Sequence, residues 1–144
     1  MTHLLIVAHG SKSNLANRTV QQLAKKVALH LPVSVDKVSV GFLEFSQPSI
    51  QSLIENSFLE CTQNLLILPY FLSNGMHVTK DIPNIIQTAE RKWPSMRITL
   101  LPHIGAMEEM SNLIAKRCVE TLIINHELAP VKTMPKHYEL EMNG

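Results

Sequence analysis

The sequence predicts an α/β protein built on one parallel sheet with helices on both faces. Along its 144 residues, four short apolar runs alternate with four segments of helical periodicity, the order of repeated strand–helix units. The runs are nearly continuous in apolar residues, as strands covered on both faces are. The length fits one domain with a sizeable core.

The nearly continuous apolar character is clearest in the first run, HLLIVA, and the third, NLLILPYF. The third run is the most hydrophobic of the four. Neither run has the spacing of an amphipathic helix, and both are short enough for strands. We therefore expect strands at residues 3–8, 34–42, 64–71 and 96–102.

The segments between the runs carry apolar residues at intervals of three and four, the spacing of a helix face. Prolines mark their limits: Pro32 ends the first, Pro48 suits the first turn of the second, and Pro94 stops the third. The apolar stripes are Val20–Leu31, Ile50–Phe58, Ile82–Trp93 and Met107–Leu122.

Right-handed crossovers make all the strands point the same way, so every loop that follows a strand lies at one edge of the sheet. We expect a four-stranded parallel sheet in the order 2-1-3-4, a flavodoxin-like arrangement, within a single domain at residues 1–124. Residues 125–144 carry two prolines and no clear period, and we expect an extended tail or arm there. Ligands of such folds bind at the carboxyl ends of the strands.

Composition excludes several classes of protein. The chain has 45% apolar and 17% charged residues and a formal net charge of +1, without the basic face of a nucleic-acid or membrane-surface binder. No segment is long and apolar enough for a membrane span or has the form of a signal peptide, so we expect a cytoplasmic protein. Cys61 and Cys118 have no CxxC partner, and we expect two reduced thiols in or near the core.

Polar residues gather where the strands end. His9 follows the first strand, Glu44 the second, His77 the third and His103 the fourth. With the first and third strands adjacent, His9 and His77 are expected to face each other across the crevice. The remaining histidines are expected on the solvated surface: His3, His30, His126 and His137.

Two neutral imidazoles suit a borderline divalent ion such as Co²⁺, Ni²⁺ or Fe²⁺. Two nitrogens and one carboxylate are too few for a closed structural site, so the ion would stay exchangeable. The same imidazoles can accept protons. A histidine before a glycine at a strand end is also often only a hydrogen-bonded turn, and the motif HGS alone does not decide between these readings.

Four segments of the chain carry a combined signature: LLIVAHGS (4–11), GFLEFSQPSI (41–50), LPYFLSNGMHVTKDIP (68–83) and LPHIGAMEEMSNLI (101–114). Together they resemble the class II tetrapyrrole metal chelatases, and specifically the short sirohydrochlorin cobaltochelatases called CbiX, which are related to the sirohydrochlorin ferrochelatases and the archaeal nickel-sirohydrochlorin enzymes. The segments follow the family's order and spacing up to about Arg117, and the third, with Gly-x-His before Asp-Ile-Pro, is the most specific.

This resemblance implies ATP-independent insertion of a divalent metal into sirohydrochlorin, for cobalamin or siroheme synthesis. It places His9 and His77 as metal ligands, His9 also as proton acceptor, and Glu44 as a carboxylate of the same cleft. No permanently bound cofactor is implied, since the metal ion is a substrate. The residues that fall at substrate-contacting positions are Gln47, Leu72, Ser73, Asn74, Gly75, Met76 and His77.

The resemblance also implies a homodimer, because short members of the family pair while longer relatives carry two such units in one chain, and this chain has the short size. Family members often have an acidic residue where this chain has Gln47, so a hydrogen-bonding role is expected there instead of a charged one. We expect backbone N–H groups of the Leu72–Met76 loop to meet the substrate's carboxylates, with Gly75 allowing close approach. An apolar wall for the macrocycle is expected from Phe42, Leu43, Tyr70 and Phe71.

Alternatives stay open at this point. A cobalt- or nickel-binding carrier or sensor would need the same two histidines but no tetrapyrrole cleft. A phosphate-binding α/β domain would use His9-Gly10-Ser11 and leave His77 unexplained. The sequence does not choose among the three metals, or between sirohydrochlorin and a related precorrin.

Overall fold

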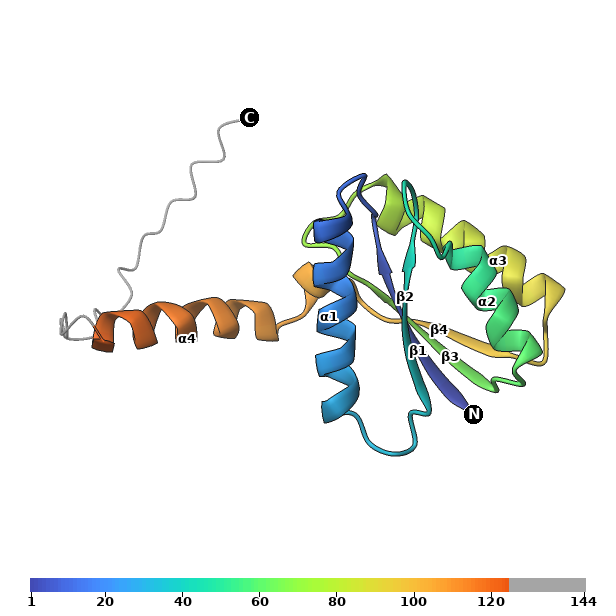
Figure 1. Cartoon of the computed structure of the whole chain (residues 1–144), viewed down its shortest axis with the longest axis horizontal. Coiled ribbons are helices and arrows are strands. Elements are labelled where there is room, and N and C mark those ends of the chain that lie inside the picture. Colours follow the sequence, from blue (N-terminus) through green and yellow to red (C-terminus); the bar gives the residue numbers. More distant parts are fainter. Residues whose placement is uncertain (125–144) are drawn as a thin grey trace. The chain divides into compact units, whose positions relative to one another are not determined.

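A computed structural model describes residues 1–124 of the chain. Four parallel strands form one sheet in the order β2-β1-β3-β4, which confirms the predicted order (Figure 1). Adjacent strands pair in register from His3 opposite Lys37 and from Thr2 opposite Asn64. The strands are β1 (Thr2–Ala8), β2 (Lys37–Phe42), β3 (Asn64–Pro69) and β4 (Arg97–Leu100).

Helices follow each strand as expected, with α1 on one face of the sheet and α2 and α3 on the other (Figure 1). The third helix differs from the prediction at its start, because a single π-helical turn, η1, runs directly into it. The helical elements are α1 (Asn14–His30), α2 (Ile50–Leu59), η1 (His77–Asp81), α3 (Ile82–Lys92), the 3₁₀ turn η2 (Ile104–Ala106) and α4 (Glu109–Ile124).

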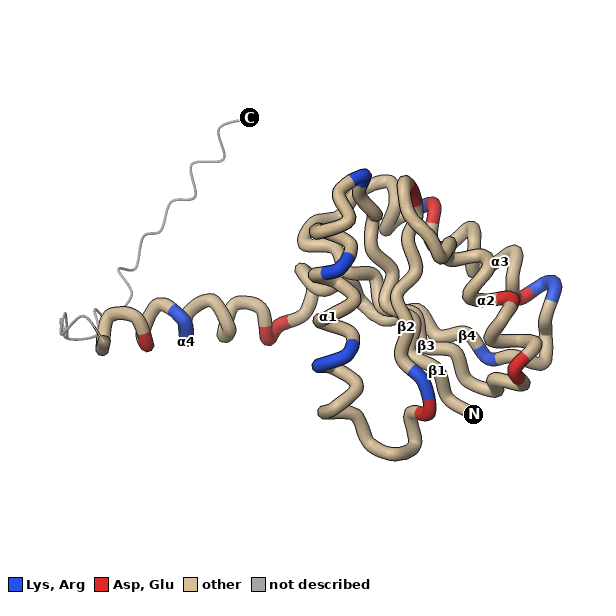
Figure 2. Tube along the Cα trace, viewed as in Figure 1, with Lys and Arg blue, Asp and Glu red and all other residues tan. Residues whose placement is uncertain are grey.

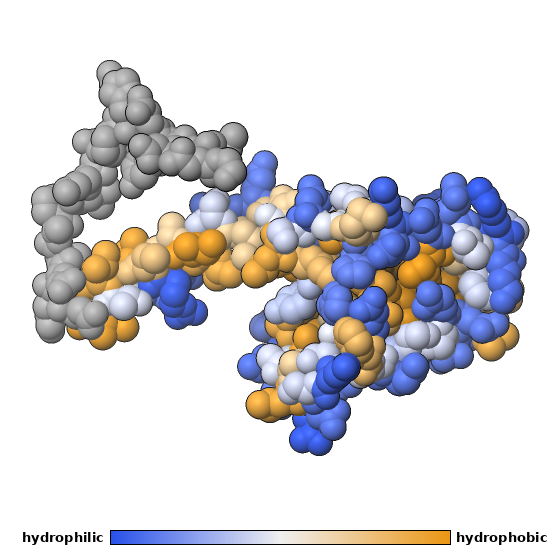
Figure 3. All heavy atoms as spheres, turned by 90° about the horizontal axis from the view of Figure 1, so that it is seen from above, coloured by the Kyte–Doolittle hydropathy of each residue, from blue (hydrophilic) through white to orange (hydrophobic). Residues whose placement is uncertain are grey.

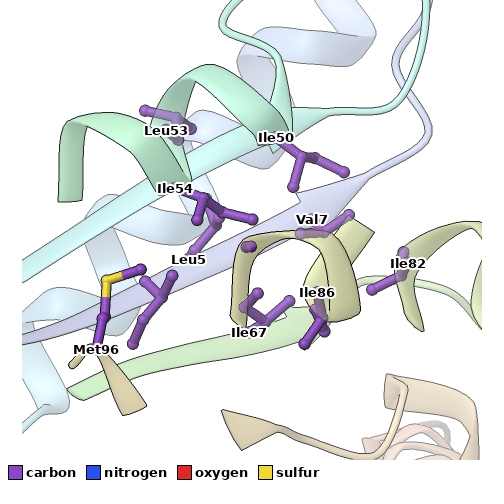
Figure 4. Packing of buried hydrophobic residues seen from close by; sticks show 11 residues of the cluster. Leu5, Val7, Ile50, Leu53, Ile54, Ile67, Ile82, Ile86 and Met96 are labelled. Carbon is purple, nitrogen blue, oxygen red and sulfur yellow. The ribbon is translucent and has the colours of Figure 1, made fainter. Parts of the chain in front are cut away.

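The sheet separates two apolar clusters. Leu5, Val7 and Ile67 point toward α2 and α3 and are fully buried there (Figure 4). On the other face, Leu4 and Ile6 pack under α1. The alternation along β1 explains its continuous apolar run, since each face of a covered parallel sheet needs an apolar partner for its helices.

His3 is buried, so its predicted place on the solvated surface is wrong. Its side chain is fully enclosed between Ser57 of α2, whose Oγ lies 2.7 Å from Nδ1, and Ser39 of β2, whose hydroxyl meets Nε2. Ser57 already donates to the Leu53 carbonyl at 2.8 Å, so Nδ1–H of His3 must donate to Ser57. Burial, and secondarily Lys37, lowers the pKa of His3 to about 4; the imidazole is a neutral bridge between two elements.

The cysteines also differ from expectation. Cys61 and Cys118 are both exposed and unpaired in the described part of the chain, so their predicted place in or near the core is wrong. His30, at the end of α1, is exposed as expected. His126 and His137 lie outside the described residues.

Residues Met1–Met107 form one compact unit, and the described residues from Glu108 to Ile124 belong to a second. Taken by itself, α4 has no buried residue, and apolar atoms run along much of it (Figure 3). Its exposed large apolar residues are Leu113, Ile114, Val119, Leu122, Ile123 and Ile124. The predicted tail at 125–144 lies outside the described residues.

Candidate active site

The loops after β1 and β2 are joined backbone to backbone. Leu43 N–H donates to the Ala8 carbonyl at 3.0 Å and Glu44 N–H to the His9 carbonyl at 2.9 Å. Gly10 has φ +93°, and a Cβ there would lie 1.9 Å from the Glu44 carbonyl oxygen. Only glycine fits this position, and the contact holds His9 beside Glu44.

The His9 ring has one nitrogen occupied and one free. Its Nδ1 lies 3.0 Å from the Gly10 carbonyl, and because a carbonyl only accepts, Nδ1 carries the hydrogen. In the neutral ring Nε2 then has its lone pair free, and it lies 3.7 Å from Oε2 of Glu44. Both side chains are nearly half exposed, so this nitrogen is open to an incoming ion.

His77 reaches the same place from the π-helical turn η1. Its Nδ1 lies 2.7 Å from Oδ2 of Asp81, which leaves its Nε2 free by the same argument. The two imidazoles meet edge to face, with ring centroids 4.8 Å apart and planes at 73°. The structure thus brings together the two histidines that the sequence placed across the crevice.

The donor set is open rather than closed. Within residues 1–124, no group of three or more histidine, cysteine, aspartate or glutamate side chains is arranged to hold a metal ion. His9 and His77 bring two imidazole rings together, and the Glu44 carboxylate lies 3.7 Å from Nε2 of His9 without completing a group of three ligands. Such a set fits a divalent ion of the borderline class and leaves coordination positions for another ligand.

The Leu72–Met76 loop is exposed along its length. A Cβ added at Gly75 would meet nothing within 4 Å, so no described residue fills the space beside this glycine. The opposite holds at Gly105 of η2, where a Cβ would lie 1.7 Å from the Leu72 carbonyl oxygen and where N–H donates to the Phe71 carbonyl at 3.0 Å. The turn η2 therefore supports the loop from one side and leaves Gly75 open.

Aromatic rings flank the two histidines, but Phe45 lies there in place of Phe42, which the sequence had suggested. Phe42 is 1% exposed and belongs to the core under α1, so it cannot line a crevice. Phe45, which the sequence reasoning missed, is 59% exposed and lies 6.1 Å from the His9 ring, between centroids. Phe71 lies 6.4 Å from the His77 ring, and Tyr70 is exposed.

The signal for Phe45 was present in the sequence, since it directly follows Glu44 in the exit loop of β2. Its φ of +59°, which a bulky residue rarely adopts, turns the ring out of the core. The Nζ atom of Lys12 lies 5.5 Å from the centroid of this ring. A cation and an aromatic face therefore stand together beside His9.

Two other predicted residues take less direct positions. Gln47 is exposed, and its Oε1 accepts from Ser49 N–H at 3.0 Å at the start of α2, which leaves the amide NH₂ free to donate outward. His103 precedes η2; within the described residues the ring contacts of His9 and His77 do not include it.

A groove of about 340 Å³ lies elsewhere, between α2 and α3. Ile54, Ile85 and Trp93 contribute apolar side chains to it, and its lining contains no histidine or cysteine. Without a nitrogen or sulfur ligand for a borderline ion, it is not an alternative metal site.

Comparison with known proteins decides the family. The family model described as CbiX matches residues 3–121. The chain belongs to the CbiX family. The sirohydrochlorin cobaltochelatase of Methanosarcina barkeri is 32% identical over 127 residues, which are 83% of this chain and 95% of that protein. The sirohydrochlorin ferrochelatase of Bacillus subtilis is 28% identical over 114 residues, 79% of this chain and 43% of that protein.

Coverage varies among the relatives of this CbiX chain. The match to the sirohydrochlorin cobaltochelatase of Methanocaldococcus jannaschii, 30% identical, spans 62% of each protein. Among solved structures, the sirohydrochlorin chelatase SirB from Bacillus subtilis subspecies spizizenii, in complex with cobalt, superimposes with a TM-score of 0.71 and 25% identity. The match covers 83% of this chain and 50% of SirB, which confirms the chelatase fold and shows a relative of about twice the matched length.

Within residues 1–124, no helix has the length and hydropathy that a membrane crossing requires.

Proposed function

We propose that this CbiX-family chain is a sirohydrochlorin metal chelatase, which inserts a divalent ion, Co²⁺ foremost and Ni²⁺ or Fe²⁺ as further candidates, without ATP. The observation that carries the proposal is the edge-to-face contact of His9 and His77, whose ring centroids are 4.8 Å apart, with Glu44 beside His9. The names of the relatives, cobaltochelatase and ferrochelatase, support the same reaction.

Metallation requires an ion to lose its water and a macrocycle to lose two N–H protons. The free Nε2 atoms of His9 and His77 can hold the ion at the edge of the sheet while keeping its shell open. As the ion passes to the ring nitrogens, the freed imidazole of His9 can accept one proton, and Glu44, 3.7 Å from it, can accept the second.

The macrocycle would lie against the aromatic rings on either side of the pair. Phe45 beside His9 and Phe71 beside His77 offer apolar faces. The exposed Leu72–Met76 loop offers backbone N–H groups to peripheral carboxylates of the substrate, with the free space at Gly75 allowing close approach. Lys12, near the Phe45 ring, supplies a positive charge for the same carboxylates, and Gln47 a neutral donor.

Replacing His77 with alanine tests this proposal directly. We expect His77→Ala to lose metal insertion, measured from the visible spectrum of sirohydrochlorin with Co²⁺, while its unfolding temperature stays within a few degrees, because the side chain lies outside both core clusters. His30→Ala, an exposed histidine at the end of α1, is the matched control and should retain full activity. Near-normal insertion by the His77 variant would contradict the proposal.

A metal carrier or sensor without chelatase activity is not favoured, because the relatives are named as chelatases. The same assay separates the two functions. If the unaltered protein binds Co²⁺ but leaves the insertion rate at its spontaneous value, the carrier function replaces the proposed one. Running the assay with Co²⁺, Ni²⁺ and Fe²⁺ in competition identifies the preferred ion.

We also propose that two chains pair as a homodimer. The exposed apolar residues of α4 and the existence of a relative in which the match covers half the chain support this. The exposed, unpaired thiols of Cys61 and Cys118 suit a reducing compartment, and we propose that the reaction takes place in the cytoplasm.

A further inference from the structure

We propose that Asp81 is a positioning residue. It makes His77 the ligand of the His9–His77 pair that anchors the metal ion. Its carboxylate holds His77 in the tautomer with hydrogen on Nδ1, so that Nε2 keeps its lone pair for a metal ion. This inference deepens the proposed function and rests on the metal-ligand role proposed there for His77.

The contact itself is short and built into the backbone. Nδ1 of His77 and Oδ2 of Asp81 are 2.7 Å apart, the length of a charge-assisted hydrogen bond. The π-helical turn places the two residues one turn apart, with Ile82 N–H donating to the His77 carbonyl. Such turns are rare and occur often at functional sites.

Among residues 1–124, the only side-chain hydrogen bond of this carboxylate is the one to His77. Asp81 stands where α3 begins, and aspartate there usually accepts from backbone N–H groups of the first turn. Here its side chain makes no capping bond, because its own backbone is helical, with φ −67° and ψ −51°, and η1 leads directly into α3. The Asp81 side chain therefore serves His77 rather than the helix.

The two imidazoles are held unequally. His9 donates to a neutral carbonyl, that of Gly10, at 3.0 Å, whereas His77 donates to a carboxylate at 2.7 Å. A carboxylate partner at this distance fixes the orientation of a ligating imidazole more firmly than a neutral carbonyl does. His77 should therefore hold the ion more tightly than His9, whose Nδ1 partner is a neutral carbonyl.

The test compares three variants of the full chain, Asp81→Ala, Asp81→Asn and Glu90→Ala. Glu90 is an exposed acid on α3, so its removal matches the change in charge on the same helix. Two quantities are measured: the dissociation constant for Co²⁺ alone, and the tautomer of His77 from long-range ¹H–¹⁵N correlation spectra at a pH where the ring is neutral.

We expect Asp81→Ala to weaken Co²⁺ binding about 10- to 100-fold and to give a mixture of His77 tautomers. Asp81→Asn keeps an acceptor without the charge, so it should retain the Nδ1–H tautomer and lose less affinity. Glu90→Ala should stay within about twofold of the unaltered protein, since it touches neither histidine. A merely structural role for Asp81 would lower stability without changing the tautomer.

The inference is overturned if Asp81→Ala keeps a single Nδ1–H tautomer and binds Co²⁺ as tightly as Glu90→Ala, or if the unaltered chain binds no Co²⁺. Failure of the proposed function gives a different result. Asp81-dependent Co²⁺ binding with no acceleration of insertion would contradict the chelatase activity alone, and accelerated insertion with no dependence of binding on Asp81 would contradict this inference alone.

Discussion

His3 and His77 each donate from Nδ1, but their surroundings give the two rings different tasks. His3 lies fully buried between Ser39 and Ser57, where a positive charge would lose its hydration. His77 is about one-third exposed, with its second nitrogen open beside His9. One residue type thus forms a neutral structural bridge at the amino end of the sheet and, in the proposed function, a metal donor at the carboxyl end.

The buried ring predicts a pH dependence of stability. The pKa of His3 is lowered in the folded protein to about 4 from about 6.5 in the unfolded chain, so between these values the unfolded state binds more protons. Stability should be complete above pH 6.5 and fall as the pH drops from 6.5 to 4, by at most about 3 kcal/mol from this residue.

His3→Gln isolates this effect in urea unfolding curves recorded from pH 4 to pH 8. The variant cannot titrate, so its free energy of unfolding should depend less on pH within that window, although it should be lower at pH 8, by about 1–3 kcal/mol, because the hydrogen bonds are less well met. An unchanged slope between pH 4 and 6.5 would show that other groups dominate.

A substitution of Phe45 tests separately whether the macrocycle binds beside His9. Phe45→Ala removes an exposed aromatic face next to His9 without touching either core cluster. We expect the KM for sirohydrochlorin to rise by about 10-fold, equivalent to about 1.4 kcal/mol of stacking and apolar contact, with the Co²⁺ dissociation constant unchanged. An unaltered KM would place the macrocycle away from this ring.

At the scale of elements, the site is assembled by the contacts between loops. The exits of β1 and β2 are joined at Gly10, and the exit of β3 rests on η2 at Gly105. At each contact the glycine has no side chain, so two backbone segments can approach each other closely. The carboxyl edge of the sheet is therefore held by its own backbone, while the Leu72–Met76 loop remains exposed.

Gly75→Ala and Gly105→Ala form a matched pair on this edge. At Gly105 an added methyl group would overlap the Leu72 carbonyl, so we expect a loss of about 2–4 kcal/mol in unfolding free energy and a displaced loop. At Gly75 the methyl group meets only open space, so stability should stay within about 0.5–1 kcal/mol, while the KM for sirohydrochlorin rises if the substrate approaches there. Equal stability of the two variants would contradict the supporting role of η2.

At the scale of the whole molecule, charge is dispersed. Acidic and basic residues both occur over the described chain, with only basic ones along α1 (Figure 2), and the formal net charge is +1. A net charge this small creates no strong general field, so we propose that an anionic substrate is bound by local groups such as Lys12 and the loop N–H groups.

The exposed apolar residues of α4 predict that two whole molecules associate through this helix. Ile114, Val119 and Leu122 are about half exposed, and burying them between two copies would remove apolar surface from water. We expect sedimentation to give a dimer for the unaltered chain and a monomer for the double variant Ile114→Glu, Leu122→Glu. Arg117→Glu, on the same helix, is the control for added negative charge and should stay dimeric; a monomeric unaltered chain would contradict the homodimer.

The sequence by itself determined the order of elements, the sheet order 2-1-3-4 and the gathering of His9, Glu44 and His77 at one edge. These follow from local periodicity and from the handedness of crossovers, which depend on short stretches of chain. Its motifs also pointed to the CbiX family, which the family match confirmed.

Only the tertiary structure decided which histidine is buried, which nitrogen of each ring is free, and which phenylalanine faces the site. His3 has the same polar side chain as His9, but two serines from distant elements enclose it. Phe42 and Phe45 are three residues apart, and a positive φ sends the second outward. Burial and hydrogen-bond partners depend on contacts between residues far apart in the chain, which no local pattern records.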